Sequence, residues 1–149
     1  MKRALHSLSL AVVLSSASTL AAADTKPEIT VYKSPTCSCC IDWAKHMEAS
    51  GFSVKRIDTK RINTIKADAG LTPDLASCHT AFIDGYVIEG HVPADDVKRL
   101  LAESPDTLGL SVPGMPIGSP GMEMGDRHDY YQVLMFNDRG QSRVFAEHN

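Results

Sequence analysis

The sequence predicts an α/β protein in which helices flank a mixed β-sheet. Three observations lead to this fold class. A β-rich segment runs directly into a cysteine-rich turn, and a helical pattern follows that turn. A strand–helix–strand beginning favours parallel pairing and a sheet that helices cover. A later pair of β-rich segments, separated by a glycine turn, would add antiparallel strands to the same sheet.

The first strand and the first helix flank the cysteines. The strand is expected over residues 28–34, EITVYKS, because this run favours β structure and stops at Pro35. Residues 41–50 place apolar side chains at helical spacing, and Gly51 ends the pattern, so a helix is expected there. A strand that ends in a Cys-x-x-Cys pair opening a helix is typical of a thioredoxin-like arrangement.

The middle of the chain repeats this alternation. Residues 52–58 alternate imperfectly and predict a second strand, and residues 60–69 predict a short helix with Ile62, Ile65 and Ala69 on one face. Two further strands are expected over residues 80–84 and 86–92, joined at Gly85. Pro93 then opens a helix to Glu103, with Asp95 and Asp96 near its positive end.

The C-terminal third has a different composition. Residues 109–125 are so rich in glycine, proline and methionine that we expect an irregular Gly/Pro/Met-rich loop. After it, YYQVLMF, a four-residue Asn-Asp-Arg-Gly turn and QSRVF predict a C-terminal β-hairpin. The expected order is β-α-β-α-β-β-α, followed by this extension.

The N-terminus predicts export. Lys2 and Arg3 precede an acid-free run of apolar and small residues over 4–20, and alanines occupy positions 21–23. This pattern indicates a signal peptide over residues 1–23, cleaved near Ala23, and a single mature domain over residues 24–149. The densest apolar run, residues 8–14, is too short to span a bilayer comfortably, and no second long run follows. We therefore expect no membrane partner after cleavage.

The charge balance argues against two classes of partner. Loss of the two N-terminal cations changes the net charge from −3 to −5, since −3 − 2 = −5. An acidic surface does not suit nucleic acid or an anionic membrane.

Three of the four cysteines, Cys37, Cys39 and Cys40, lie within four consecutive positions in SPTCSCC. At a helix N-terminus the backbone amides favour a thiolate, which is both the nucleophile of thiol exchange and a soft metal ligand. A redox pair needs only an attacking and a resolving thiol, whereas a soft-metal site gains from Cys39 as well. We expect a Cu(I) or Zn(II) site; the alternatives are a redox pair of Cys37 and Cys40, or a structural disulfide from either to Cys78.

A second segment is expected to face this turn. In thioredoxin-type chains a cis-proline precedes the third strand and packs against the Cys-x-x-Cys turn. Aligning HTAFI with that strand puts His79 or Thr80 at the proline position, with Cys78 directly before it. A fourth thiol and an imidazole would then approach the first three cysteines. The ordinary alternative for His79 is a hydrogen-bonded histidine at a strand end.

Three more residues are candidate ligands. His91 ends the fourth strand, where it would otherwise be a surface loop histidine. Met115 and Met122 lie in the glycine-rich segment, where core filling explains them poorly and a thioether suits Cu(I). The glycines would let this segment fold over the site as a lid.

Three sequence blocks carry a resemblance to a known family. YKSPTCSCC, SCHTAFIDGYVIEGHVPADDVKRLL and GLSVPGMPIGSPGMEMG resemble, in the same order, the CopG-type family, long catalogued as a domain of unknown function. The resemblance runs from about Glu28 to Phe145. It implies a thioredoxin-like protein of the Gram-negative periplasm, associated with copper resistance. It also implies that Cys37, Cys39, Cys40 and Cys78 bind copper.

The expected function is therefore a periplasmic copper-binding protein that holds Cu(I) through four thiolates. A thiol–disulfide oxidoreductase, with Cys37 as nucleophile and Cys40 as resolving thiol, is the alternative. A hybrid would couple thiol oxidation to Cu(II) reduction. A chaperone that passes copper to another periplasmic copper-handling protein is a third possibility. Zinc suits four sulfurs as well.

Overall fold

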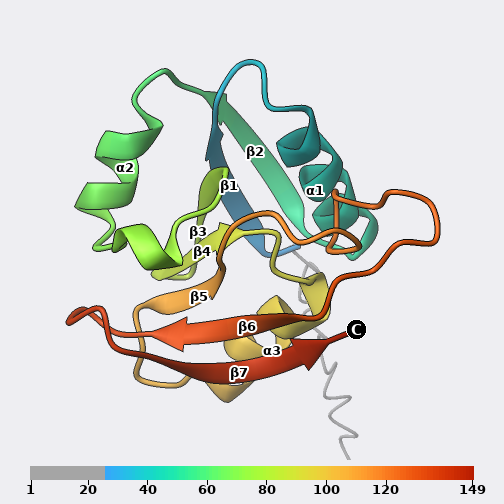
Figure 1. Ribbon diagram of the computed structural model, residues 1–149. Coiled ribbons are helices and arrows are strands. Elements are labelled where there is room, and N and C mark those ends of the chain that lie inside the picture. Colours follow the sequence, from blue (N-terminus) through green and yellow to red (C-terminus); the bar gives the residue numbers. More distant parts are fainter. Residues whose placement is uncertain (1–25) are drawn as a thin grey trace, which may run out of the picture.

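The computed structural model describes residues 26–149, and the expected signal peptide, residues 1–23, lies outside them. Seven strands form one mixed sheet with the order β2-β1-β3-β4-β5-β6-β7. Three α-helices and one short 3₁₀ helix accompany it (Figure 1). The strands are β1 (Glu28–Lys33), β2 (Ser53–Asp58), β3 (His79–Ile83), β4 (Tyr86–Gly90), β5 (Gly109–Val112), β6 (Tyr131–Phe136) and β7 (Ser142–His148). The helices are α1 (Ser38–Ala49), α2 (Ile62–Asp68), η1 (Pro73–Leu75) and α3 (Ala94–Glu103). The expected α/β class is confirmed.

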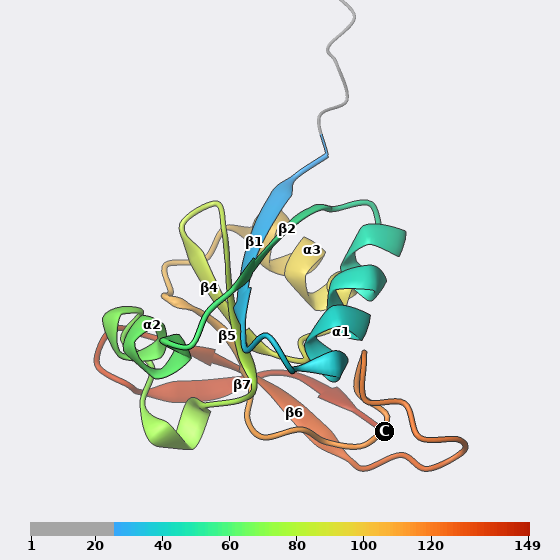
Figure 2. The ribbon, with the colours of Figure 1, turned by 90° about the horizontal axis from the view of Figure 1, so that it is seen from above.

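The helices lie on the two faces of the sheet (Figure 2). Helices α1 and α3 cover one face, where Trp43, Met47 and Leu100 pack against inward side chains of the strands. Helix α2 and η1 lie on the other face, above a smaller cluster around Leu75 and Phe136. None of the helices within residues 26–149 is long and apolar enough to cross a membrane.

Strand pairing follows the expected alternation. β1 pairs with β2 in parallel and with β3 antiparallel, and β3 and β4 form a tight hairpin. The hairpin turn is Asp84-Gly85, and both residues have positive φ, +50° and +83°. Such angles suit the two-residue turns whose twist matches that of the flanking strands. The C-terminal hairpin of β6 and β7 is also present, as expected.

One expectation about the glycine-rich segment is wrong. Residues 109–112 form β5, a fully buried central strand between β4 and β6, and are not part of an irregular loop. Gly109 misled the prediction because glycine usually weakens strands. Here a Cβ at Gly109 would lie 1.8 Å from the carbonyl oxygen of Val87, so only glycine allows β5 to approach β4 this closely.

Candidate metal and thiol site

The cysteine turn is built on the N-terminus of α1. The helix begins at Ser38, three residues before the expected start, and Cys37 is its N-cap. The Cys37 Sγ accepts a hydrogen bond from the backbone N–H of Cys40 at 3.3 Å, satisfying one of the free amides of the first turn. A disulfide joins Cys37 to Cys40, while Cys39 and Cys78 remain thiols. The disulfide therefore closes within the turn, and neither alternative pairing with Cys78 is present.

Cys78 reaches this turn through strand pairing. His79 of β3 lies opposite Lys33, the last residue of β1, so the residue before β3 lies beside the turn that follows β1. The Cys78 Sγ lies 3.6 Å from the Cys40 Sγ and 3.9 Å from the Cys39 Sγ. The four sulfur atoms all lie within 4.8 Å of one another. The expected approach of the fourth thiol is confirmed.

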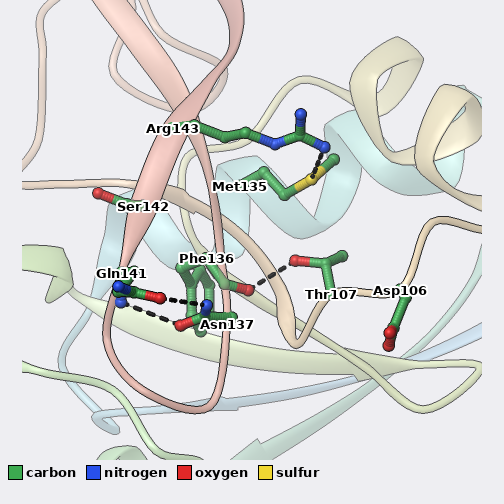
Figure 3. A pocket seen from close by; sticks show the side chains of 8 residues that line it. All are labelled: Asp106, Thr107, Met135, Phe136, Asn137, Gln141, Ser142 and Arg143. Atoms are coloured by element: carbon green, nitrogen blue, oxygen red, sulfur yellow. Dashed lines mark hydrogen bonds between the residues drawn. The ribbon is translucent and has the colours of Figure 1, made fainter.

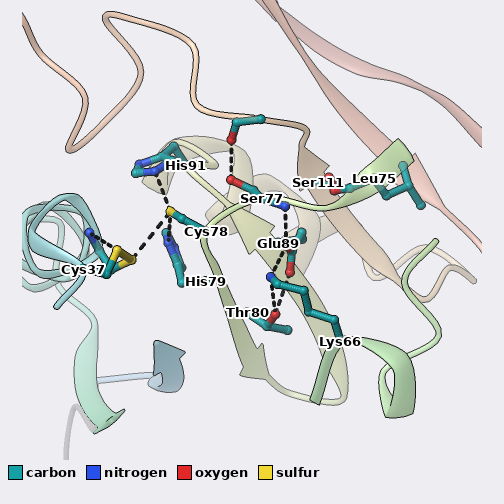
Figure 4. Close-up of polar contacts among 12 residues, drawn as sticks. Cys37, Lys66, Leu75, Ser77, Cys78, His79, Thr80, Glu89, His91 and Ser111 are labelled. Atoms are coloured by element: carbon teal, nitrogen blue, oxygen red, sulfur yellow. Dashed lines mark hydrogen bonds and ion pairs between the residues drawn. A yellow bond between two sulfur atoms is a disulfide. The ribbon is translucent and has the colours of Figure 1, made fainter. Parts of the chain in front are cut away.

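Two histidines flank Cys78 (Figure 4). The Cys78 Sγ is 3.0 Å from His91 Nε2 and 3.3 Å from His79 Nδ1. Both imidazoles are fully buried, and the His79 ring lies between Trp43 and His91, with ring centroids 4.4 Å and 5.1 Å away. His91 is thus not a surface loop residue; it lies at the wall of the site.

The partners of His91 fix its tautomer. Its Nδ1 lies 2.8 Å from the carbonyl oxygen of Pro120, which can only accept, so Nδ1 carries the proton. The Nε2 lone pair then faces the Cys78 sulfur, and the Cys78 thiol donates to it. If Cys78 lost this proton, a thiolate and a lone pair would face each other at 3.0 Å. A metal cation in place of the proton could bind both the Cys78 sulfur and the His91 Nε2.

Burial keeps these groups neutral. It raises the pKa of Cys78 to about 12, and the neighbouring Cys39 thiol adds to the rise. Burial also lowers the pKa of His91 and, more strongly, that of His79, where the charges of His91 and Lys66 act in the same direction. The resting site therefore offers unprotonated imidazole nitrogens and a thiol that loses its proton only to a strong competitor.

The segment between β5 and β6, residues 113–130, folds over the site, and we call it the strap. Its Pro120 carbonyl oxygen holds His91. Next to it, Gly121 has φ of +84° and packs closely on α1. A Cβ there would lie 2.6 Å from the backbone nitrogen of Trp43 and 2.7 Å from the carbonyl oxygen of Cys39. The glycine is thus required both by its conformation and by this close approach.

The two candidate methionines lie on the strap at different depths. Met122 directly follows Gly121 and is partly buried, whereas Met115 exposes 53% of its surface. Within residues 26–149, the contacts that join the four cysteines and two histidines include neither methionine. Their role as ligands stays a prediction.

Sequence reasoning missed a buried polar group beneath the site. Glu89 is fully buried and Lys66 is 8% exposed, and the two form an ion pair. The expected inward face of α2 held Ile62, Ile65 and Ala69, which are only partly buried, while Lys66 is the one buried residue of that helix. A signal was available, because Glu89 shares the face of β4 with the buried Val87.

The molecule also has a pocket away from the cysteines. It lies at the turn end of the β6–β7 hairpin and is lined by residues of that hairpin and of the segment before β5 (Figure 3). Thr107 donates to the Phe136 carbonyl oxygen there at 2.6 Å, and Arg143 contacts the Met135 sulfur. None of the residues that line it is a cysteine or a histidine.

Comparisons with known proteins identify relatives. The family model described as a protein of unknown function, DUF411, matches residues 75–122. A solved structure titled "Copper resistance protein copG- Form 2" is 46% identical, with a TM-score of 0.80 over 83% of this chain and 99% of that one. A second, titled "Copper resistance protein copG- Form 1", is 48% identical, with a TM-score of 0.78 over 83% and 98% of the two chains.

The search of curated proteins finds no match. The two solved structures are far above the identity at which a shared fold alone would be inferred, and this chain covers nearly all of each. The matched DUF411 segment contains Cys78, His79 and His91 and ends at Met122. The chain therefore belongs to the CopG-type DUF411 family.

Proposed function

We propose that this protein binds Cu(I) through the thiolates of Cys37, Cys39, Cys40 and Cys78 and acts in copper resistance. The observation that carries the proposal is the position of Cys78, from a distant segment, within 4.8 Å of the three sulfurs of the turn. Thiolate and imidazole are the donors that soft, monovalent copper prefers. The titles of the two related structures, both copper resistance proteins, support copper as the metal.

The distances from the Cys78 sulfur to the Cys39 and Cys40 sulfurs are compatible with zinc as well. Around a tetrahedral zinc with bonds of about 2.3 Å, sulfur atoms lie about 3.8 Å apart. The spacings from Cys78, 3.6 and 3.9 Å, are close to that value. Copper is preferred because the relatives are named for it and because His91 and His79 offer two further donors beside a four-sulfur set that zinc alone would already fill.

The disulfide supports a redox step in the same site. With Cys37 and Cys40 bonded, only Cys39 and Cys78 can supply thiolates. In the reduced protein, the thiols of Cys37 and Cys40 would each give one electron to a Cu(II) ion, forming the disulfide and two Cu(I) ions. The protons of the two thiols are released to solvent. Copper binding and the oxidation state of the turn would therefore be coupled.

The fold supports the thioredoxin-like part of the proposal. The β2-β1-β3-β4 portion of the sheet, with β1 parallel to β2 and antiparallel to β3, places the Cys-x-x-Cys pair at the N-terminus of α1. That is where such proteins carry their reactive thiols. We further propose that the mature domain begins near Asp24 and resides in the periplasm. N-terminal sequencing of protein recovered from the periplasm tests this.

The test of copper binding is an anaerobic titration of the reduced mature protein with Cu(I) against a chelator of known affinity. Wild type is expected to compete, and the triple variant Cys37→Ser, Cys39→Ser, Cys40→Ser is expected to lose this ability. Equal competition by both would overturn the proposal. Parallel titration with Zn(II) distinguishes the two metals.

A second candidate function is thiol–disulfide exchange without metal. It is favoured by the disulfide itself and by the partial exposure of Cys37, which leaves this sulfur open to a partner thiolate. Disulfide reductase activity that survives copper chelators and disappears in Cys37→Ser would support it. Absence of such turnover in the copper-free protein would leave copper binding as the function.

A further inference from the structure

A buried ion pair lies beside the segment that carries Cys78. Lys66 of α2 and Glu89 of β4 are in contact, and both are removed from solvent (Figure 4). Buried ion pairs contribute little net stability, because the cost of desolvating two charges offsets their attraction. A purely structural explanation of this pair is therefore weak, and its remaining contacts indicate another role.

Those contacts hold both ends of one short segment. The Glu89 Oε1 accepts the backbone N–H of Ser77 at 2.6 Å, and the Oε2 accepts the Thr80 hydroxyl at 2.6 Å. The Lys66 ammonium also donates to the Thr80 hydroxyl at 3.0 Å. The segment between these two anchors consists of Cys78 and His79.

Other contacts prevent this segment from moving outward. The Ser77 hydroxyl donates to the carbonyl oxygen of Gly114 on the strap. On the opposite side, a Cβ at Gly90 would lie 2.4 Å from the Ser77 Oγ, so the backbone of β4 is in close contact with Ser77. The segment is thus held from α2, from β4 and from the strap.

We infer that Lys66 and Glu89 are a positioning pair, which holds Cys78 at the distance from the cysteine turn that a shared metal ion requires. This inference rests on the proposed copper binding and extends it to residues that do not touch the metal. The charges of the pair cancel, so the pair orients the segment without adding net charge beneath the thiolates. Removal of such outer contacts typically costs 10- to 100-fold in metal affinity.

The test compares two charge-balanced double variants. In Lys66→Met with Glu89→Leu, which we call the apolar double variant, the acceptor of the Ser77 N–H is lost, and Cu(I) affinity is expected to fall about 10- to 100-fold. In Lys66→Met with Glu89→Gln, the amide oxygen still accepts from Ser77 and the amide nitrogen can donate to Thr80. This conservative variant is expected to retain most of the affinity. The exposed pair Lys98 and Asp95, changed to Met and Asn, is the matched control.

A cycle with Cys78→Ser separates positioning from general destabilisation. If the pair acts through Cys78, the two substitutions of the apolar double variant cost little further affinity once Cys78 is already replaced by serine, so the effects are not additive. An equal loss in both backgrounds would overturn the inference. So would equal losses in the two double variants.

A measurement without metal keeps this inference distinct from the proposed function. In the disulfide form, Cys39 and Cys78 are the free thiols, and their alkylation rates can be followed peptide by peptide. In the apolar double variant, release of the Cys78 segment is expected to accelerate alkylation of Cys78 severalfold relative to wild type. The alkylation rate of Cys39 is expected to stay unchanged. This result in a protein that fails to bind Cu(I) would support the positioning pair while refuting copper binding, and unchanged Cys78 reactivity would overturn the positioning pair itself.

Discussion

Replacement of Gly121 by alanine is expected to release the strap from the site. Gly121 has φ of +84°, and an alanine Cβ there would lie 2.6 Å from the Trp43 nitrogen. Ordinary contact begins at about 3.4 Å, so the strap must move by about 0.8 Å. If Pro120 moves equally, its 2.8 Å contact with His91 lengthens to about 3.6 Å, beyond hydrogen-bonding distance.

A matched control is available in the same strap. Gly125 also has positive φ, +62°, but a Cβ there would meet no atom within 4 Å. Both variants carry the cost of a left-handed alanine, about 1 kcal/mol or more, and only Gly121→Ala adds the overlap and the lost hydrogen bond. The lost bond costs about 0.5–1.5 kcal/mol, so strap opening should be favoured roughly 2- to 13-fold beyond the control.

Hydrogen exchange of the strap amides measures this difference. The N–H groups of Gly118 and Met122 are hydrogen-bonded within the strap, to the carbonyl oxygens of Met122 and Ser119. Their exchange should accelerate in Gly121→Ala relative to Gly125→Ala, and Cu(I) transfer to a chelator should accelerate with it. Equal exchange in the two variants would refute the close packing of Gly121 as the cause of strap closure.

Four further predictions concern the oxidation state of the turn, the pH dependence of stability (two predictions) and the fluorescence of the single tryptophan. The reduced protein should retain more Cu(I) against a chelator than the form with the Cys37–Cys40 disulfide, because reduction restores two thiolates. The pKa of Cys78 is raised from 9.0 to about 12, so the free energy of unfolding should fall as pH rises from about 9 to 12; chemical denaturation of Cys78→Ser should show a smaller fall. The pKa of His79 is lowered, so stability should fall as pH drops below 6.5, and His79→Gln should weaken this dependence. Copper loading should change the fluorescence of Trp43, whose ring lies 4.4 Å from that of His79; an unchanged spectrum at saturation would place the metal away from this histidine.

Much of the fold could be predicted because local patterns were consistent with it. The alternation of strands and helices up to Glu103 was correct, and the tight turn at Gly85 follows from glycine chemistry. β5 was missed because a residue with no side chain gives no hydrophobic signal. Glycine is required at position 109 by a tertiary contact, because the carbonyl group of Val87 lies where a Cβ would be.

The part of the candidate site that depends on strand order could be predicted from the sequence. The approach of Cys78 follows from the position of β3 next to β1, which the thioredoxin-like alignment predicts. Lys66 and Glu89 were not found, because charged residues are expected on the surface unless a partner is known. The hydrogen bond between His91 and Pro120 could not be predicted either, since the sequence of an irregular strap has no periodic pattern that indicates its path.

The separation of the site into a local turn and a distant cysteine has a consequence for the order in which disulfides form during folding. Cys37 and Cys40 are 3 residues apart, whereas Cys40 and Cys78 are 38 apart. Closing the longer loop in an unfolded chain costs about 2 kcal/mol more by the logarithmic dependence on length. Oxidation that precedes folding therefore favours the turn over pairings with Cys78. Early closure of the turn would leave Cys78 as a free thiol, which it still is in the folded protein, and would protect the chain from a misplaced crosslink during folding.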